Sequence, residues 1–203
     1  MKIICVGRNY VEHIAELNNE RPDEPVLFIK PDTALLSKEF PFVIPDFSQD
    51  IHYEAEVVVK ITKVGKYIDA KFAHKYYDQV SLGIDFTARD LQAKLKEKGL
   101  PWEKAKAFDN SAFVGDFLPK TDFESLGDLA FSFQQNGKTV QEATTAQMIW
   151  NIDALIAEIS TYFTLKTGDL IFTGTPVGVG KVNPGDLLEG FLEDKKVFDL
   201  IVK

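Results

Sequence analysis

The sequence predicts an α+β fold that is mainly β, with more strands than helices. Two stretches, residues 51–61 and 80–86, alternate apolar and polar side chains as half-buried strands do. Strand and helix segments do not alternate regularly, which argues against a doubly wound parallel sheet. The chain has 203 residues, 45% of them hydrophobic, and is therefore long enough for one substantial core. We expect a single domain over residues 1–203.

The first 45 residues or so predict a small N-terminal cap. Ile3–Val6 is a short apolar strand. A short helix is predicted over about residues 10–18, with Asn9 as its N-cap. Five prolines interrupt residues 21–45, so this segment should be extended and rich in loops, apart from a strand at Val26–Ile29.

The central strands carry acidic residues. Ile51–Ile61 is the clearest strand, because its odd positions are nearly all apolar while its even positions include Glu54 and Glu56. One face of this strand is therefore predicted to lie in the core and the other to be polar. Val80–Phe86 alternates in the same way and leads to Asp85 at its C-terminal end.

Two helices and two turn-strand units complete the predicted fold. One helix starts with a sequence like a capping box, Thr87–Asp90, and stops at Gly99–Pro101. A longer helix is predicted over about residues 145–160, where apolar residues form one broad face. Thr167–Phe172 and Pro184–Leu188 share the phrase Gly-Asp-Leu, which is typical of strands that follow tight turns.

Composition excludes several function classes. The 31 acidic residues outnumber the 23 Lys and Arg, giving a net charge of −8, so general binding to phosphate backbones or anionic membranes is not expected. The single cysteine, Cys5, excludes an internal disulfide framework and a cysteine-rich zinc site. The sequence contains no apolar run of membrane-spanning length and no standard signal peptide, so we expect a cytoplasmic protein.

A glycine-rich segment near the C-terminus is superficially similar to nucleotide-binding loops. Residues 174–181 read Gly-Thr-Pro-Val-Gly-Val-Gly-Lys, but Thr175 stands where a P-loop needs glycine and Val182 where it needs a hydroxyl. No strand-helix-strand unit surrounds Gly178-Val-Gly180, as a dinucleotide fingerprint requires. We therefore do not expect this segment to bind nucleotides.

Glu54, Glu56 and Asp85 are the candidate metal ligands. Two residues apart on a strand, the glutamates project from one face, roughly 6.6 Å apart along the chain. With Asp85 they would form an all-oxygen site that suits a hard cation such as Mg²⁺ or Mn²⁺. The alternative is that the glutamates are only the solvated face of an amphipathic strand, which spacing alone favours.

Other polar residues have two interpretations each. His13 and Glu16 lie at i and i+3 on the first helix, where a carboxylate beside an imidazole activates a water molecule, or where both are simply solvated. Lys106 would stabilise an oxyanion, although an isolated lysine is usually a surface charge. Arg89 and Gln92 share a helix face just after Asp85 and either reach a ligand there or are solvated.

Several motifs, in order along nearly the whole chain, resemble the fumarylacetoacetate hydrolase family and within it the acylpyruvase and oxaloacetate decarboxylase branch. They are Cys5-Val-Gly-Arg-Asn-Tyr10 with His13 and Glu16, Phe28-Ile-Lys-Pro31 with Thr33, His52-Tyr-Glu-Ala-Glu56, Asp85-Phe-Thr-Ala-Arg-Asp90, Lys106-Ala-Phe108 and Thr173-Gly-Thr-Pro176. The resemblance implies a mixed β-roll, a short N-terminal lid helix, and usually a homodimer. It also implies Mg²⁺ or Mn²⁺ on Glu54, Glu56 and Asp85.

The same resemblance implies roles for other residues. His13 and Glu16 match the family's catalytic pair on the lid, and Lys106 matches a lysine that assists at the developing oxyanion. Arg8, Lys30, Arg89, Gln92 and Thr175 match positions that line the substrate pocket.

Three functions follow as expectations. The first is metal-dependent hydrolysis of a C–C bond in acylpyruvates such as acetylpyruvate or fumarylpyruvate, with oxaloacetate decarboxylation as a related activity. The second is isomerisation, hydration or decarboxylation of unsaturated 2-oxo diacids. The third is a non-catalytic metabolite-binding domain that retains the fold.

Overall fold

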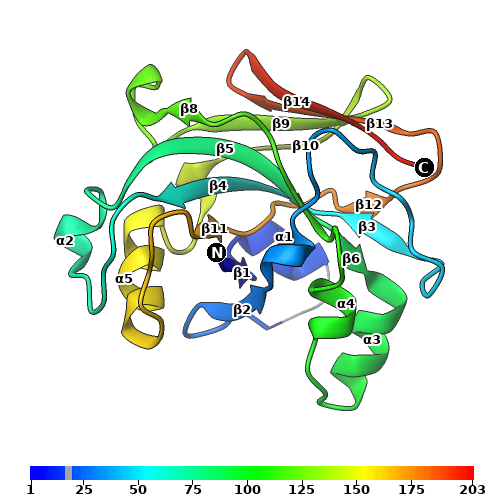
Figure 1. Cartoon of the computed structure of the whole chain (residues 1–203), viewed down its shortest axis with the longest axis horizontal. Helices are drawn as coiled ribbons and strands as arrows, with labels where there is room; N and C mark the ends of the chain where they lie inside the picture. The colour runs from blue at the N-terminus through cyan, green and yellow to red at the C-terminus, as the bar shows by residue number, and fades with distance from the viewer. Residues whose placement is uncertain (17–19) are drawn as a thin grey trace.

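Three β-sheets and a few short helices make up the fold, which is mainly β as predicted (Figure 1). The computed structural model describes residues 1–16 and 20–203. The large sheet has the order β2-β1-β11-β4-β5-β7, with β8 paired to β5. Its strands are β1 Ile3–Gly7, β2 Val26–Lys30, β4 Ala55–Ile61, β5 Tyr77–Asp85, β7 Ala112–Val114, β8 Leu118–Pro119 and β11 Leu170–Phe172.

Two smaller sheets and the helices surround this large sheet. The four-stranded sheet has the order β10-β9-β13-β14, and the three-stranded sheet has the order β12-β3-β6. Their strands are β9 Ala130–Gln135, β10 Lys138–Thr144, β13 Leu187–Leu192, β14 Lys195–Ile201, β3 Ile51–Tyr53, β6 Thr87–Ala88 and β12 Gly180–Lys181. The helices are α1 Val11–Glu16, α2 Ala70–Ala73, α3 Arg89–Glu97, α4 Glu103–Lys106 and α5 Ile152–Tyr162, with 3₁₀ turns at Asp32–Ala34, Lys120–Asp122 and Thr145–Gln147.

Both faces of the large sheet are buried. The main core lies between this sheet, the four-stranded sheet and α5, and it includes Val57, Phe133 and Leu155. A smaller cluster on the other face contains Val58 and Phe172. Because even and odd positions of β4 are both covered, the alternative in which one face of this strand is solvated is wrong.

The predicted strand over 51–61 is divided at Glu54. Residues before this point pair with β6 and β12, whereas those after it pair with β5 and β11. The backbone N–H of Asp85 donates to the carbonyl of Glu54 at 2.9 Å, so the end of β5 lies against this joint. Apolar and polar side chains keep alternating through Glu54. The alternation therefore does not reveal that the chain passes from one sheet to another at this residue.

The N-terminal strands belong to the large sheet. β1 pairs with β2 and, in parallel, with β11, so the cap predicted for about residues 1–45 contributes two strands to the large sheet, with β2 at its edge. α1 begins at Val11, and the predicted continuation of this helix to residue 18 reaches beyond the described residues. The Asn9 side chain does not cap α1. It bonds the backbone of Trp150 and Thr173 instead.

The helix predicted over residues 145–160 begins later, at Ile152. Thr145–Gln147 is a 3₁₀ turn, and Met148 then pairs with Tyr10 in an isolated bridge. Asn151 caps α5 by accepting a hydrogen bond from the Ala154 N–H at 2.9 Å. The pairing of residues 148–150 with the segment before α1 therefore overrides the local helical pattern.

The capping box predicted at Thr87 is also absent among the described residues. Thr87 and Ala88 form β6, and α3 starts at Arg89 without a side-chain cap.

No helix in the described parts of the chain is both long and apolar enough to span a membrane.

In each Gly-Asp-Leu segment the aspartate side chain accepts a backbone hydrogen bond that closes the preceding turn. Asp169 accepts a hydrogen bond from the Lys166 N–H at 2.8 Å, and Asp186 accepts one from the Asn183 N–H at 2.7 Å. Asp169 also accepts from the backbone N–H of Lys2 at 3.0 Å and forms an ion pair with the Lys2 ammonium. It thereby joins the start of β1 to the start of β11.

We expect Asp169→Asn to destabilise the protein in a pH-dependent way. Burial alone would raise the pKa of Asp169, but hydrogen bonds from Lys2 and Lys166 outweigh it and hold the pKa below its usual value. A depressed pKa contributes stability above the unfolded-state pKa, and this contribution is lost as the pH falls through the folded-state pKa. Urea unfolding should show a loss of about 2 kcal/mol at pH 7, shrinking below about pH 4.

Asp109→Asn is the matched control, because this aspartate is exposed. It should change the free energy of unfolding by less than about 0.5 kcal/mol at either pH. A loss for Asp169→Asn that is equally large at pH 3 and pH 7 would contradict the charge-based explanation.

Candidate active site

Three buried carboxylates meet where β4 and β5 approach each other. Glu54, Glu56 and Asp85 each offer an oxygen within 4.8 Å of the others. Their residues are 6%, 2% and 0% exposed, so they are not the solvated strand face of the alternative interpretation. Glu54 lies at the joint between two sheets, Glu56 on β4 and Asp85 at the end of β5.

Three cations surround these carboxylates. The Lys106 ammonium lies 2.7 Å from both Glu54 Oε2 and Asp85 Oδ2. The second Glu54 oxygen, Oε1, accepts from the Arg89 guanidinium at 2.5 Å. Lys30 Nζ lies 2.7 Å from Asp85 Oδ1. Removing one partner from such a buried ion pair leaves an uncompensated charge, which costs far more than the pair contributes to stability.

The charge balance differs between the glutamates. Burial alone would raise the pKa of Glu54, but Lys106 and Arg89 outweigh it and hold the pKa well below the usual range. Burial raises the pKa of Glu56 well above its usual value, and the nearby Asp85 and Glu54 add to this. A hydrogen bond from the Gly174 N–H to Glu56 Oε2, at 2.6 Å, only partly offsets these effects.

The donor set fits a divalent cation. Three close carboxylates supply oxygen ligands of the kind that Mg²⁺ and Mn²⁺ prefer. The raised pKa of Glu56 indicates that the existing cations do not fully compensate the third carboxylate. An added positive charge would do so and would lower the pKa of Glu56.

A cavity of about 50 Å³ opens onto the carboxylates. Nine of the residues predicted for the site line it, namely Arg8, His13, Glu54, Glu56, Asp85, Arg89, Gln92, Lys106 and Thr175. Phe28 and Trp102 form an apolar wall, with their ring centroids 6.2 Å apart. The Lys106 ammonium lies 5.4 Å from the centroid of the Phe28 ring.

His13 and Glu16 lie on α1 at the edge of this cavity. His13 Nδ1 is 2.9 Å from Glu16 Oε2, and the residue is only 6% exposed. The other Glu16 oxygen, Oε1, accepts from the backbone N–H of Gly178 at 3.0 Å. Glu16 therefore connects the imidazole to the loop that follows β11.

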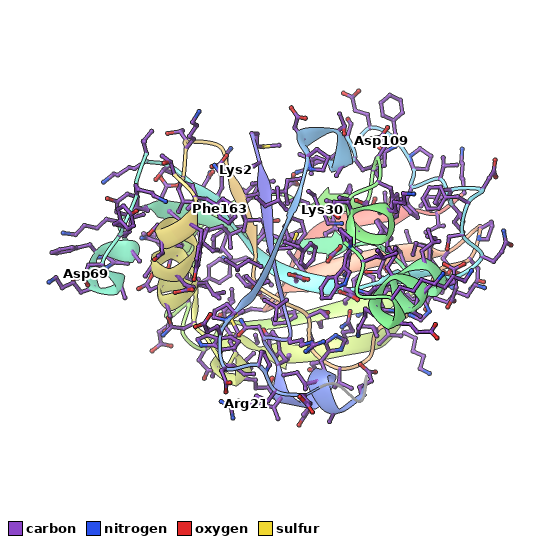
Figure 2. All side chains as sticks on the ribbon, turned by 90° about the horizontal axis from the view of Figure 1, so that it is seen from below. Lys2, Arg21, Lys30, Asp69, Asp109 and Phe163 are labelled. Carbon is purple, nitrogen blue, oxygen red and sulfur yellow. The ribbon has the colours of Figure 1, made fainter. Side chains whose placement is uncertain are left out.

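Lys30 lies behind the cavity, whereas the resemblance implied that it lines the pocket. Its Nζ donates to Ser111 O and Ser111 Oγ, both at 3.0 Å, and to the carbonyl of Lys106. Figure 2 shows Lys30 near the middle of the molecule, whereas Asp69 lies at its edge. Lys30 thus contacts the Asp85 carboxylate and the Lys106 backbone rather than the cavity.

Arg89 and Gln92 share one face of α3, as their spacing predicted. Arg89 donates from one NH group to Gln92 Oε1 at 2.7 Å and from the other to Glu54. Because both side chains face the cavity, the interpretation of this pair as solvated helix surface is wrong.

Two supporting residues were not predicted as parts of the site, although Asn9 lies within the first family motif. Asn9 is fully buried and joins the segment before α1 to Trp150 and to Thr173, at the end of β11. Gln141 comes from the four-stranded sheet and contacts Ala55 and Thr175. Asn9 contacts segments more than 140 residues away, and Gln141 contacts residues 86 and 34 positions away, and sequence spacing carries no information on such contacts.

Comparisons with known proteins agree with this architecture. The family model described as fumarylacetoacetate (FAA) hydrolase C-terminal matches residues 2–196. A protein from Escherichia coli named oxaloacetate tautomerase is 44% identical over 190 residues, which cover 92% of this chain and 86% of that protein. One from Dictyostelium discoideum named oxaloacetate decarboxylase, mitochondrial, is 41% identical, and the match covers 100% and 94% of the two chains.

Solved structures show the same fold. A fumarylpyruvate hydrolase from Pseudomonas aeruginosa, in complex with Mn²⁺ and pyruvate, matches with a TM-score of 0.93 and 35% identity, over 100% of this chain and 89% of that one. A protein from Yersinia pestis described as belonging to this hydrolase family matches with a TM-score of 0.95 and 40% identity, over 100% and 93%. A family match over nearly the whole sequence, relatives above 40% identity and these structures together show that the chain belongs to the fumarylacetoacetate hydrolase family.

Proposed function

We propose that this protein is an enzyme that uses Mg²⁺ or Mn²⁺ to move a proton at C3 of a small 2-oxo acid, with oxaloacetate as the first substrate to test. The observation that carries this proposal is His13, which is paired with Glu16 and lines one small cavity together with the three carboxylates. The names of the relatives at 41–44% identity, oxaloacetate tautomerase and oxaloacetate decarboxylase, support the same substrate.

The site residues divide into three groups. Glu54, Glu56 and Asp85 would hold the cation, which when bound supplies positive charge for the carboxylate and 2-oxo oxygens of the substrate. Arg8, Arg89, Gln92 and Thr175 would contact the substrate. Lys106 would stabilise negative charge that develops on the 2-oxo oxygen, since its ammonium already lies among the carboxylates.

His13 and Glu16 would carry the proton. In keto–enol exchange of oxaloacetate, one proton leaves C3 and the C2 oxygen gains one, so no C–C bond breaks and no co-reactant is used. His13 can accept the proton, while Glu16 orients the ring and shares the resulting charge. The loop N–H of Gly178 keeps the Glu16 carboxylate facing His13.

Hydrolysis of acylpyruvates is the second candidate. A fumarylpyruvate hydrolase shares the fold at 35% identity, and the His13–Glu16 pair is equally suited to activating a water molecule. In that reaction water adds across a C–C bond and releases pyruvate and a carboxylic acid. Isomerisation of unsaturated 2-oxo diacids is a further alternative. The homodimer implied by the family resemblance stays a prediction.

Side-by-side turnover assays would separate these reactions. Oxaloacetate, acetylpyruvate, fumarylpyruvate and an unsaturated 2-oxo diacid would each be supplied with Mg²⁺ or Mn²⁺. Ultraviolet absorbance follows the enol forms, and product analysis detects pyruvate. Turnover of acetylpyruvate without acceleration of oxaloacetate exchange would reverse the order of the candidates, and turnover of none would overturn both.

We expect His13→Ala and Glu16→Ala each to lower kcat/KM by roughly a hundredfold on the substrate that wild type turns over, because the proton acceptor or its partner is lost. His74→Ala is the control, since this histidine is exposed and lies just after α2. Steady-state kinetics with a saturating metal ion would measure the effect. Wild-type rates in both variants would refute the assigned roles.

We expect Mn²⁺ to raise the melting temperature by binding only the folded state. At a concentration near 100 times its dissociation constant, the gain is about 2.7 kcal/mol, or roughly 5–10 °C for a chain of this size. Glu56→Gln should remove most of this shift because it removes one anionic ligand. Glu124→Gln, at an exposed position, should keep it; if both variants respond as wild type does, Glu56 is not a ligand.

Gly178→Ala should lower kcat by roughly tenfold or more through misplacement of Glu16. Gly178 has φ +100°, and a Cβ there would lie 2.2 Å from the carbonyl oxygen of Val140. Gly137→Ala is the control, because its φ of +75° imposes similar strain but nothing lies within 4 Å of its Cβ position. If the two variants lose the same amount of activity, backbone strain rather than the contact with Glu16 explains the loss.

A further inference from the structure

Gln141 is a buried polar residue that does not itself line the cavity. It lies on β10 in the four-stranded sheet and is 1% exposed. The pairing of β10 with β9 shifts register between Thr139 and Gln141, which is the mark of a β-bulge. Bulges redirect side chains, and here the Gln141 side chain reaches residues of the large sheet and of the loop after β11.

The Gln141 amide makes three hydrogen bonds. Its Oε1 accepts from the backbone N–H of Ala55 at 2.9 Å. Its Nε2 donates to the carbonyl of Pro176 at 2.9 Å and to Thr175 Oγ1 at 2.8 Å. A backbone N–H can only donate and a carbonyl can only accept, so these two partners fix which end of the amide is oxygen and which is nitrogen.

This orientation determines the polarity of the Thr175 hydroxyl. Because Thr175 Oγ1 accepts a hydrogen from Gln141, its own hydrogen is directed elsewhere. Thr175 lines the cavity beside the carboxylates and is 3% exposed. Its hydroxyl is therefore arranged to donate to a hydrogen-bond acceptor in the cavity, such as a carboxylate or 2-oxo oxygen.

The other end of the amide acts on the carboxylate cluster. Ala55 lies between Glu54 and Glu56, beyond the part of β4 that pairs with β11. Thr173 N–H still bonds the carbonyl of Val57, but the N–H of Ala55 is held by the Gln141 side chain. The Gln141 side chain thus makes the hydrogen bond to β4 that a longer β11 would make, and it fixes the backbone that carries both glutamates.

We infer that Gln141 is a positioning residue, which sets the spacing of Glu54 and Glu56 and turns the Thr175 hydroxyl toward an anionic substrate. The role toward substrate rests on the proposed function, whereas the role toward the glutamates requires only a cation. One side chain from the four-stranded sheet would in this way position both the two glutamates and the Thr175 hydroxyl.

Two titrations test this inference, first with Mn²⁺ and then with pyruvate added to the Mn²⁺-loaded protein. Gln141→Met keeps the length of the side chain and removes all three hydrogen bonds. We expect it to weaken Mn²⁺ binding several-fold and pyruvate binding by roughly tenfold or more. Gln134→Met, on the neighbouring strand β9, is the matched control and should leave both affinities unchanged.

Gln141→Glu separates the two roles and serves also if Gln141→Met does not fold. Its carboxylate still accepts from Ala55, but it accepts from the Thr175 hydroxyl as well and turns that hydrogen away from the cavity. Mn²⁺ affinity should then be at least that of wild type, while pyruvate affinity falls roughly tenfold. Thr175→Val should cause a similar loss, and the double variant Gln141→Met/Thr175→Val should lose pyruvate affinity little more than the worse single variant.

The outcomes are distinct. A lower melting temperature with unchanged affinities for Mn²⁺ and pyruvate in both Gln141 variants would show a merely structural role and overturn the inference. Additive losses in the double variant would overturn the route through Thr175. If wild type binds Mn²⁺ but not pyruvate, the proposed substrate class and the hydroxyl role both fail, and the Mn²⁺ titration of Gln141→Met alone decides the role toward the glutamates.

Discussion

The site depends on holding three carboxylates together in a buried place. Such groups repel one another and lose hydration, so they stay ionised only when cations and hydrogen bonds compensate them. Lys106 does this for Glu54 and Asp85 at once, and Lys30 reaches Asp85 from behind. Glu56 accepts a hydrogen bond from the Gly174 N–H, but burial and the nearby Asp85 and Glu54 outweigh this bond and raise the pKa of Glu56. The position that a further cation would stabilise most is therefore beside Glu56.

Short strands make room for this cluster. β11 ends at Phe172, which pairs with Val58 of β4. The pairing of β4 with β11 therefore stops short of the glutamates. The chain that follows β11 turns across this gap, and its backbone and side chains bond Glu56, Gln141 and Glu16. A longer β11 would satisfy the edge of β4 with backbone hydrogen bonds and would take the space of the cavity. The irregular loop is thus what allows polar groups from three elements to meet.

The sequence predicts the strands of this site better than their assembly. Alternation located both acidic strands, and family motifs located all the charged residues that line the cavity except Lys96. Alternation did not show that Glu54 is a joint between two sheets, because side chains keep alternating across it. The helix expected from residue 145 failed at its start because residues 148–150 pair with the segment before α1. Lys30 and Gln141 act across long separations in sequence, which local patterns cannot report.

Local charge also explains how an acidic protein would accommodate the acidic substrate proposed for it. The chain carries a net charge of −8, which by itself repels anions. The cavity is lined by three carboxylates and by the cations Arg8, Arg89, Lys96 and Lys106, and Lys30 contacts Asp85 from behind. Five positive charges against three negative ones give these groups a net positive formal charge when all are ionised. A divalent cation would add to this positive charge, so the site would attract an anion such as the proposed oxaloacetate although the whole chain is acidic.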